Sequence, residues 1–137
     1  MKIIAAYDGS DVGKEVLGLA EQRALQTDSQ VILIKSLLVP DPLKRKNSEA
    51  ELSEIKNQFR KKDILCDVHV SSRGMEPGED IVLFATENSA DEIIIGIKKK
   101  SKLGKILFGS NAQFIILNAP CPVLTTRGDM KYKAQLD

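Results

Sequence analysis

The sequence predicts an α/β domain built on an open, five-stranded parallel sheet with helices on both faces. Short continuous apolar runs recur along the chain, as expected for strands that are buried on both faces. Stretches with apolar residues at helical spacing separate these runs, which gives the order βαβαβαβαβ. The 137 residues, 42% of them hydrophobic, suffice for one self-standing core. No apolar run approaches the ~20 residues that span a bilayer, so a membrane partner is not expected.

The chain is expected to open with a buried strand and an amphipathic helix. Residues 3–6 form the strand, and turn residues at 8–10 end it. Ser10 or Asp11 can cap the helix that follows, because short polar side chains accept hydrogen bonds from the first free N–H groups. The helical face carries Val12, Val16, Leu19 and Ala20.

The middle of the chain predicts two more strands around a second helix. Residues 31–34 form a buried strand, and the prolines at 40 and 42 mark a loop. Ser48 can start the helix, whose apolar positions are Leu52, Ile55 and Phe59. Alternation of apolar and polar residues over 66–70 indicates a strand at the edge of the sheet.

The last part of the chain predicts two helices and two strands. Pro77 fits the first turn of a helix with Ile81, Phe84 and Ala85 facing inward. Residues 92–96 are the clearest buried strand, and a lysine-rich loop follows them. In another helix, Ala112, Ile115 and Ile116 face inward, and residues 122–126 form the last strand. Residues 1–127 are therefore expected to form the domain, and the polar tail 128–137 to be loose.

Charge and cysteine content exclude several classes of protein. A net charge of +1 gives the whole molecule no strong attraction to nucleic acid, and the 4% aromatic content disfavours base stacking. Cys66 and Cys121 are too few and too scattered for a disulfide scaffold or a metal site, so inert thiols are expected. The single histidine, His69, is expected on the outer face of its strand. The start of the chain lacks a signal-peptide pattern, and a cytoplasmic protein is expected.

Two loops are candidates for a binding site, because open α/β sheets bind ligands beyond the carboxyl ends of their strands. One spans residues 6–10 and the other residues 96–110. The second is rich in glycine, lysine and serine, which favours phosphate binding through free N–H groups and close backbone approach. The alternative is that the lysines form a solvated surface and that Gly96 only ends a strand. The loop is not a P-loop, since Ile106 stands where serine or threonine is needed.

Several spaced motifs closely resemble the universal stress protein family. They are the run 91–96, Gly109-Ser110, and the run 118–124, together with the opening residues 7–10 and the helix entry at 74–81. The resemblance covers residues 1 to about 127. It implies a Rossmann-like, adenine-nucleotide-binding fold with strand order 3-2-1-4-5, dimerisation through the last strand, and a role in the stress response.

The resemblance also implies a set of nucleotide-binding residues. Members that bind nucleotides carry Gly-x2-Gly-x9-Gly-(Ser/Thr), and here Lys99 stands at the second glycine. Its side chain either blocks the pocket or leaves Lys98, Lys99, Lys100 or Lys102 to supply charge to the phosphates in place of bare N–H groups. Asp8 is implied near the ribose or the metal–phosphate region, although it can also simply form an Asx turn with Ser10. The implied set is Ala6, Tyr7, Asp8, Ile34, Ser36, Ile95, Gly96, Lys98, Lys99, Gly109, Ser110 and Asn111.

The leading functional hypothesis is a homodimeric stress-response protein that binds ATP, AMP or another adenine nucleotide, with Mg²⁺ as a candidate companion. A family member that acts through protein contacts without nucleotide is one alternative, and a slow ATPase is another. No convincing catalytic residues are apparent, so an enzyme is not expected. Pairing of residues 122–126 with their copy would satisfy the backbone groups of an edge strand.

Overall fold

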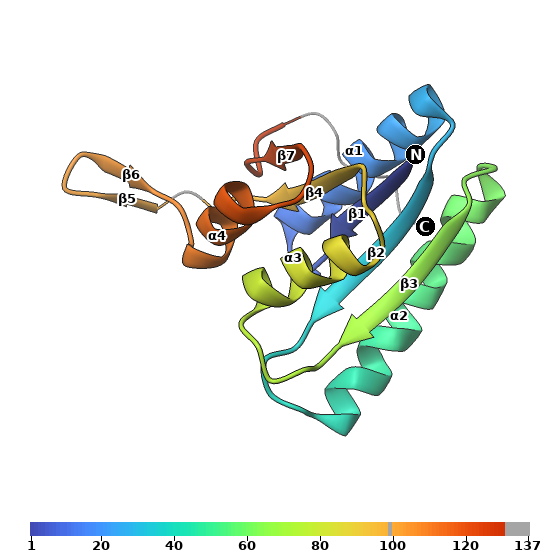
Figure 1. Ribbon diagram of the computed structural model, residues 1–137, viewed down its shortest axis with the longest axis horizontal. Helices are drawn as coiled ribbons and strands as arrows, with labels where there is room; N and C mark the ends of the chain where they lie inside the picture. The colour runs from blue at the N-terminus through green and yellow to red at the C-terminus, as the bar shows by residue number, and fades with distance from the viewer. Residues whose placement is uncertain (99, 131–137) are drawn as a thin grey trace.

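The sheet of the computed structural model has five parallel strands in the spatial order β3-β2-β1-β4-β7, which confirms the expected order of the successive sheet strands (Figure 1). The structure describes residues 1–98 and 100–130. The sheet strands are β1 (Lys2–Ala6), β2 (Gln30–Ser36), β3 (Cys66–Ser71), β4 (Glu92–Gly96) and β7 (Val123–Thr126). The helices are α1 (Asp11–Thr27), α2 (Pro42–Lys61), α3 (Pro77–Glu87) and α4 (Ser110–Asn118).

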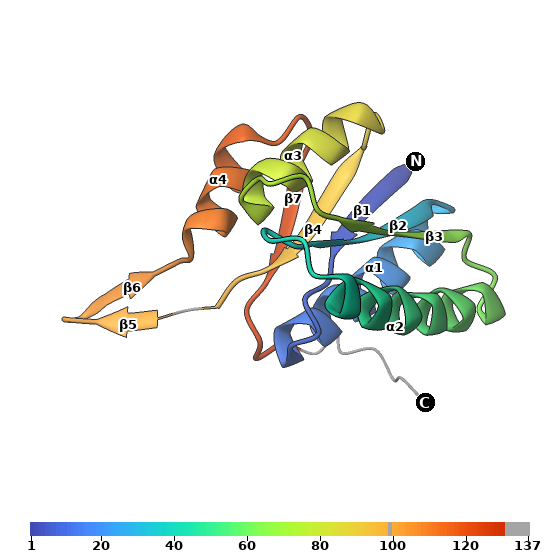
Figure 2. The same cartoon turned by 90° about the horizontal axis from the view of Figure 1, so that it is seen from below.

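Helices cover both faces of the sheet and divide the core into two layers. Figure 2 shows α1 and α2 on one side of the strands and α3 and α4 on the other. Successive strand residues point to opposite faces, so Ile3 packs in the layer of α1 and α2 while Ile4 packs in the layer of α3 and α4. Both side chains are fully buried. This arrangement leaves the carboxyl ends of the strands open between the two helical layers.

Helix α2 begins at Pro42, six residues before the start expected at Ser48. Asp41 caps it by accepting a hydrogen bond from the Lys44 N–H at 3.0 Å, and proline is well suited to a first helical position. The first turn is exposed, with Leu43 at 69%, so it carries no apolar periodicity. The Asp41 cap and Pro42 set this boundary, and the spacing of apolar residues does not reveal it.

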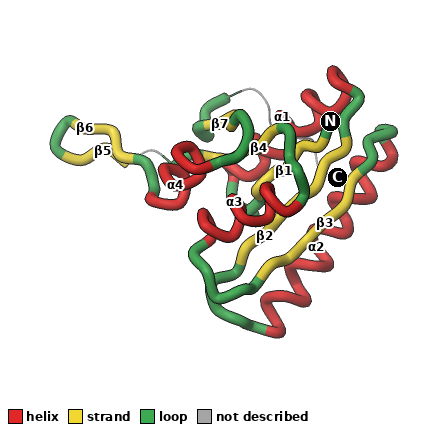
Figure 3. Tube along the Cα trace, viewed as in Figure 1, coloured by secondary structure: helices red, strands yellow, loops and turns green. Residues whose placement is uncertain are grey.

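The loop expected across residues 96–110 contains a hairpin. Strands β5 (Lys100–Lys102) and β6 (Lys105–Leu107) pair in antiparallel fashion and project away from the body of the domain (Figures 1 and 2). Leu103 and Gly104 form the turn, both with positive φ (52° and 74°), a conformation that glycine adopts without strain. Figure 3 shows a loop segment between β6 and α4. Lys99 lies outside the described residues.

The expected tail makes two contacts with the domain at its start. Glu15, fully buried in α1, accepts hydrogen bonds from the backbone N–H groups of Gly128 and Met130, both at 3.0 Å. Residues 131–137 lie outside the described part. Within the part of the chain that is described, no helix combines the length and the apolar character that crossing a membrane requires.

Candidate functional site

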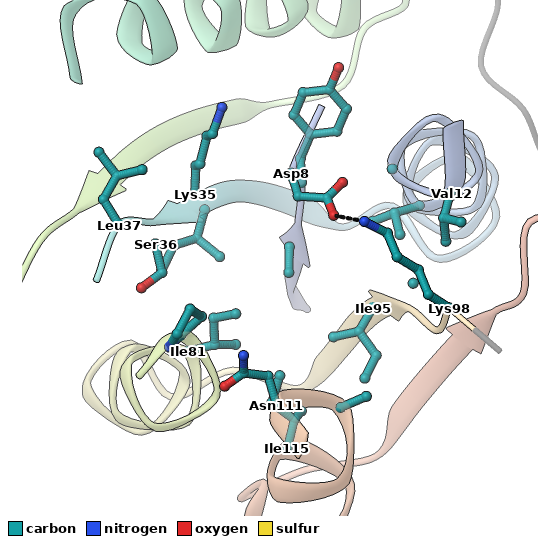
Figure 4. Close-up of a pocket in the computed structure, with 18 of the residues that line it drawn as sticks. Asp8, Val12, Lys35, Ser36, Leu37, Ile81, Ile95, Lys98, Asn111 and Ile115 are labelled. Carbon is teal, nitrogen blue, oxygen red and sulfur yellow. Dashed lines mark ion pairs between the residues drawn. The ribbon is translucent and has the colours of Figure 1, made fainter. Parts of the chain in front are cut away.

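A cavity of about 370 Å³ opens at the carboxyl end of the sheet, where the strand order reverses between β1 and β4. Ligands of open α/β proteins bind at such a switch point. The ends of β1, β2 and β4 form its floor, and the first turns of α1, α3 and α4 form its walls (Figure 4). The cavity is therefore a product of the topology, since three helices start beside the same strand ends.

Most of the residues implied by the family resemblance line this cavity. They are Ala6, Tyr7, Asp8, Ile34, Ser36, Ile95, Gly96, Lys98 and Asn111. Gly109 and Ser110 stand at the start of α4, beside Asn111 but outside the lining. Lys99 cannot be placed, because it is not among the described residues. The structure thus brings both candidate loops to one cavity.

The sequence did not identify the remaining lining residues as members of the site. Apolar side chains such as Val12, Ile81 and Ile115 were identified from periodicity only as core positions, yet their ends also form the cavity wall. Lys35 and Lys44 gave no signal at all. Lys35 lies near the end of β2, and Lys44 belongs to the turn of α2 that was expected to be a loop.

Asp8 is held in place by the start of α1. Its Oδ1 accepts hydrogen bonds from the Ser10 backbone N–H at 2.9 Å and from Ser10 Oγ at 2.5 Å, so the Asx turn is present. Ser10 Oγ in turn caps α1 by accepting from the Gly13 N–H. Burial raises the pKa of the Asp8 carboxyl, but the hydrogen bonds from Ser10 and the nearby Lys98 ammonium outweigh it and hold the pKa below its ordinary value. Asp8 is an anion at neutral pH.

Lys98 faces Asp8 across the mouth of the cavity. Its Nζ lies 3.5 Å from Asp8 Oδ2, and both side chains are more than half exposed. Figure 4 shows the two groups pointing toward one another above the apolar residues of the cavity. An exposed pair of this kind contributes little to stability. It does place one cation and one anion at the rim of a cavity with an apolar interior.

Gly96 has a packing role that the resemblance does not describe. A Cβ on residue 96 would overlap Val12 Cγ1 and would lie 3.3 Å from Val12 Cβ. The glycine therefore allows the first turn of α1 to approach the end of β4. Its φ is not positive, so conformational freedom is not the reason for a glycine here. The close contact with Val12 therefore connects Gly96 to the shape of the cavity wall.

Ser36 belongs to a buried network below the cavity. Its hydroxyl donates to Asp80 Oδ2 at 2.5 Å, while Ser71 Oγ and Arg73 Nε donate to Asp80 Oδ1 at 2.9 and 2.8 Å. Burial raises the pKa of Asp80, but these three donors together lower it below its ordinary value. The network ties the ends of β2 and β3 to α3. Ser36 therefore helps to fix the wall of the cavity.

The start of α4 adds free backbone donors near the cavity. Asn111 Oδ1 accepts the Gly78 N–H at 2.9 Å and joins α4 to α3. The N-cap residue of α4, Gly109, provides no side-chain hydrogen bond to the first turn. The first N–H groups of a helix have no partner within the helix, and they attract anions. This end of the cavity is therefore suited to a negatively charged group.

The arrangement suits a ligand with a flat apolar part and an anionic part. The lining includes Ile34, Ile81, Ile95 and Ile115, and the charged pair Asp8 and Lys98 is more than half exposed. Among the residues that the structure describes, no group of three or more histidine, cysteine, aspartate or glutamate side chains could hold a metal ion.

The chain is similar to known proteins along nearly its whole length. Residues 1–127 match the model of the universal stress protein family. A universal stress protein of Methanocaldococcus jannaschii is 31% identical over 145 aligned positions, which cover 95% of this chain and 84% of the relative. A solved universal stress protein from Archaeoglobus fulgidus has a TM-score of 0.76 at 36% identity, covering 91% of this chain and 97% of that one. Another structure from that organism, in complex with dAMP, has a TM-score of 0.74 at 31% identity over 91% and 96% of the two chains.

Proposed function

Because the chain belongs to the universal stress protein family, we propose that it binds an adenine nucleotide in the cavity between β1 and β4 and acts in the stress response as a nucleotide-binding homodimer. The observation that carries the proposal is the cavity itself, an apolar slot at the switch point with a charged rim. A relative that is 31% identical and has the same fold is described in complex with dAMP, which supports an adenine nucleotide as the ligand class.

The chemistry of the lining suggests how the nucleotide would lie. A purine ring is flat and largely apolar, so it fits among Ile34, Ile81 and Ile95. The phosphates would then point to the rim, where Lys98 and the uncapped start of α4 supply positive charge. Asp8 stands at the same rim as Lys98, where a ribose hydroxyl can donate a hydrogen bond to it.

Calorimetric titration of AMP, ADP and ATP into nucleotide-stripped protein tests the proposal. We expect binding of at least one nucleotide at high micromolar concentration or tighter. The variant Ala112→Phe, which adds a ring in the cavity lining, should abolish that binding. Leu117→Phe is the matched control, because Leu117 is 80% exposed on the same helix and outside the lining. Absence of heat with all three nucleotides would overturn the assignment.

The dimer is proposed to form through β7. This strand lies at one edge of the described sheet and carries no charge, whereas the other edge strand, β3, carries Asp67. Pro122 and Thr126 direct their carbonyls to β4, so the alternating residues Val123 and Thr125 turn their backbone groups to the open edge. An unprotected edge of this kind favours pairing with a second copy.

Sedimentation velocity measures this dimer directly. The wild type should sediment as a dimer at micromolar concentration. Thr125→Pro removes an outward N–H without removing a hydrogen bond to β4, and it should give a folded monomer. A wild type that sediments as a monomer would contradict the proposal.

Lys99 supports one alternative, a family member that acts through protein contacts without nucleotide. The side chain at this motif glycine would then occupy the phosphate region. Titration of Lys99→Gly distinguishes the two cases, because nucleotide binding that appears only in this variant would establish the alternative.

We further propose that the bound nucleotide is not turned over. Asp8 is the single carboxylate of the described cavity lining, and its oxygens face Ser10 and Lys98. It is therefore poorly placed as a general base. Phosphate release from ATP that disappears in Asp8→Ala would instead establish a slow ATPase.

A further inference from the structure

The pair formed by Asp8 and Lys98 bears on whether a divalent metal accompanies the nucleotide. A nucleotide triphosphate commonly carries Mg²⁺, which proteins hold through one or two carboxylates in addition to the phosphate oxygens. The oxygen atoms that line the cavity therefore decide whether it can hold such an ion.

The described lining offers Mg²⁺ a poor set of ligands. Asp8 is its single carboxylate, and Asp8 Oδ1 already accepts two hydrogen bonds from Ser10. Asn111 Oδ1 accepts the Gly78 N–H, and the Ser36 hydroxyl donates to Asp80. The remaining oxygen, Asp8 Oδ2, faces the Lys98 ammonium at 3.5 Å. A divalent cation at that oxygen would stand beside a like charge, so these residues do not fit the metal.

Lys98 supplies one positive charge at the place where a metal ion would stand. It follows Gly96 and Ile97 at the end of β4, and its long side chain crosses the mouth of the cavity to Asp8 (Figure 4). A lysine ammonium has three donors, so it can contact a phosphate oxygen while it remains near the carboxylate. The side chain is 62% exposed, and its reach therefore includes a ligand at the rim.

We propose that the cavity binds its nucleotide as the metal-free anion, with the Lys98 ammonium as the counter-cation in place of a divalent ion. The inference rests on the proposed function, because it concerns the same cavity. It also separates the nucleotides by charge. A monophosphate carries about −1.5 to −2 charges at neutral pH and so needs less positive charge than a triphosphate does. Complexation of ATP by Mg²⁺ competes with Lys98 for the same phosphate oxygens.

Titrations of AMP and ATP in buffer with EDTA and in buffer with Mg²⁺ test the inference. We expect equal affinity for AMP in the two buffers and no gain for ATP when Mg²⁺ is present. Lys98→Met should weaken binding in EDTA by about tenfold, because it removes a charge-assisted contact and leaves Asp8 facing the phosphate. Lys98→Arg should retain most of the affinity, since the charge is kept.

Lys61→Met is the matched control, because it removes the same charge in the last turn of α2, outside the cavity lining. It should bind as the wild type does. Binding that requires Mg²⁺, or unchanged affinity of Lys98→Met in EDTA, would overturn the inference and leave the nucleotide assignment intact. Absence of binding in both buffers would overturn the nucleotide assignment and this inference with it.

Discussion

Replacement of Gly96 by alanine tests whether this residue is needed for packing. The added methyl would overlap Val12 Cγ1 and would lie 3.5 Å from Val16 Cγ2. Valine in a helix strongly prefers one χ1 rotamer, so Val12 must leave that rotamer or α1 must move away from β4. Off-rotamer strain costs about 0.5–1.5 kcal/mol and overpacking about 1–3 kcal/mol. Loss of glycine entropy in the unfolded chain offsets about 0.4–1 kcal/mol of this.

The expected net loss for Gly96→Ala is therefore about 1–2 kcal/mol in the free energy of unfolding. Urea unfolding followed by far-ultraviolet circular dichroism measures it. Val12→Ala makes room for the new methyl, so the double variant should lose less than the sum of the single losses, by about 1 kcal/mol. Strict additivity would refute the packing argument. A variant of unchanged stability that loses nucleotide affinity would assign Gly96 to the phosphates instead.

Three further predictions concern buried polar groups. Asp80→Asn should lower stability by about 2 kcal/mol or more at neutral pH, because the donors around the carboxylate lose their charged acceptor. The pKa of Asp80 in the folded protein lies below its ordinary 3.8. The stabilisation by the carboxylate is therefore complete above pH 3.8 and is lost as the pH falls through the folded-state pKa. The urea midpoints of Asp80→Asn and wild type should converge there, and a constant gap between them would contradict this. Glu15→Ala should accelerate amide hydrogen exchange at Gly128 and Met130 at least tenfold, and unchanged rates would show that their hydrogen bonds to Glu15 are unimportant. Burial raises the pKa of Cys66 to about 12, so at pH 8 an alkylating reagent should label it only after unfolding, and rapid labelling of the native protein would contradict its burial.

The sequence predicted the fold well because its strongest signals are local and periodic. Short apolar runs such as 92–96, bounded by polar and turn residues, predict inner strands of a sheet covered on both faces, and the structure places that run in β4. The start of α2 was missed because Asp41 and Pro42 set it through capping, in a turn that buries no apolar side chain. The hairpin was missed because three-residue strands are too short to show a period.

The candidate site was predictable only where the family motifs mark it. The resemblance identified Asp8 and Lys98, but not that they face each other, since this depends on the approach of two strand ends from distant parts of the chain. Lys35 and Lys44 carry no motif and enter the lining through tertiary structure alone. Gly96 shows the opposite case, a residue assigned to a ligand that also has a packing role.

The proposed ligand of the cavity between β1 and β4 is an adenine nucleotide. Titration of AMP into isotope-labelled protein, followed by amide chemical shifts, tests both the binding and its location. We expect shift changes concentrated at Ile34 and Ser36 near the end of β2, at Gly96 and Lys98 at or just after the end of β4, and at Asn111 in α4. Spectra that do not change, or changes confined to the edge strand β3, would contradict nucleotide binding in this cavity.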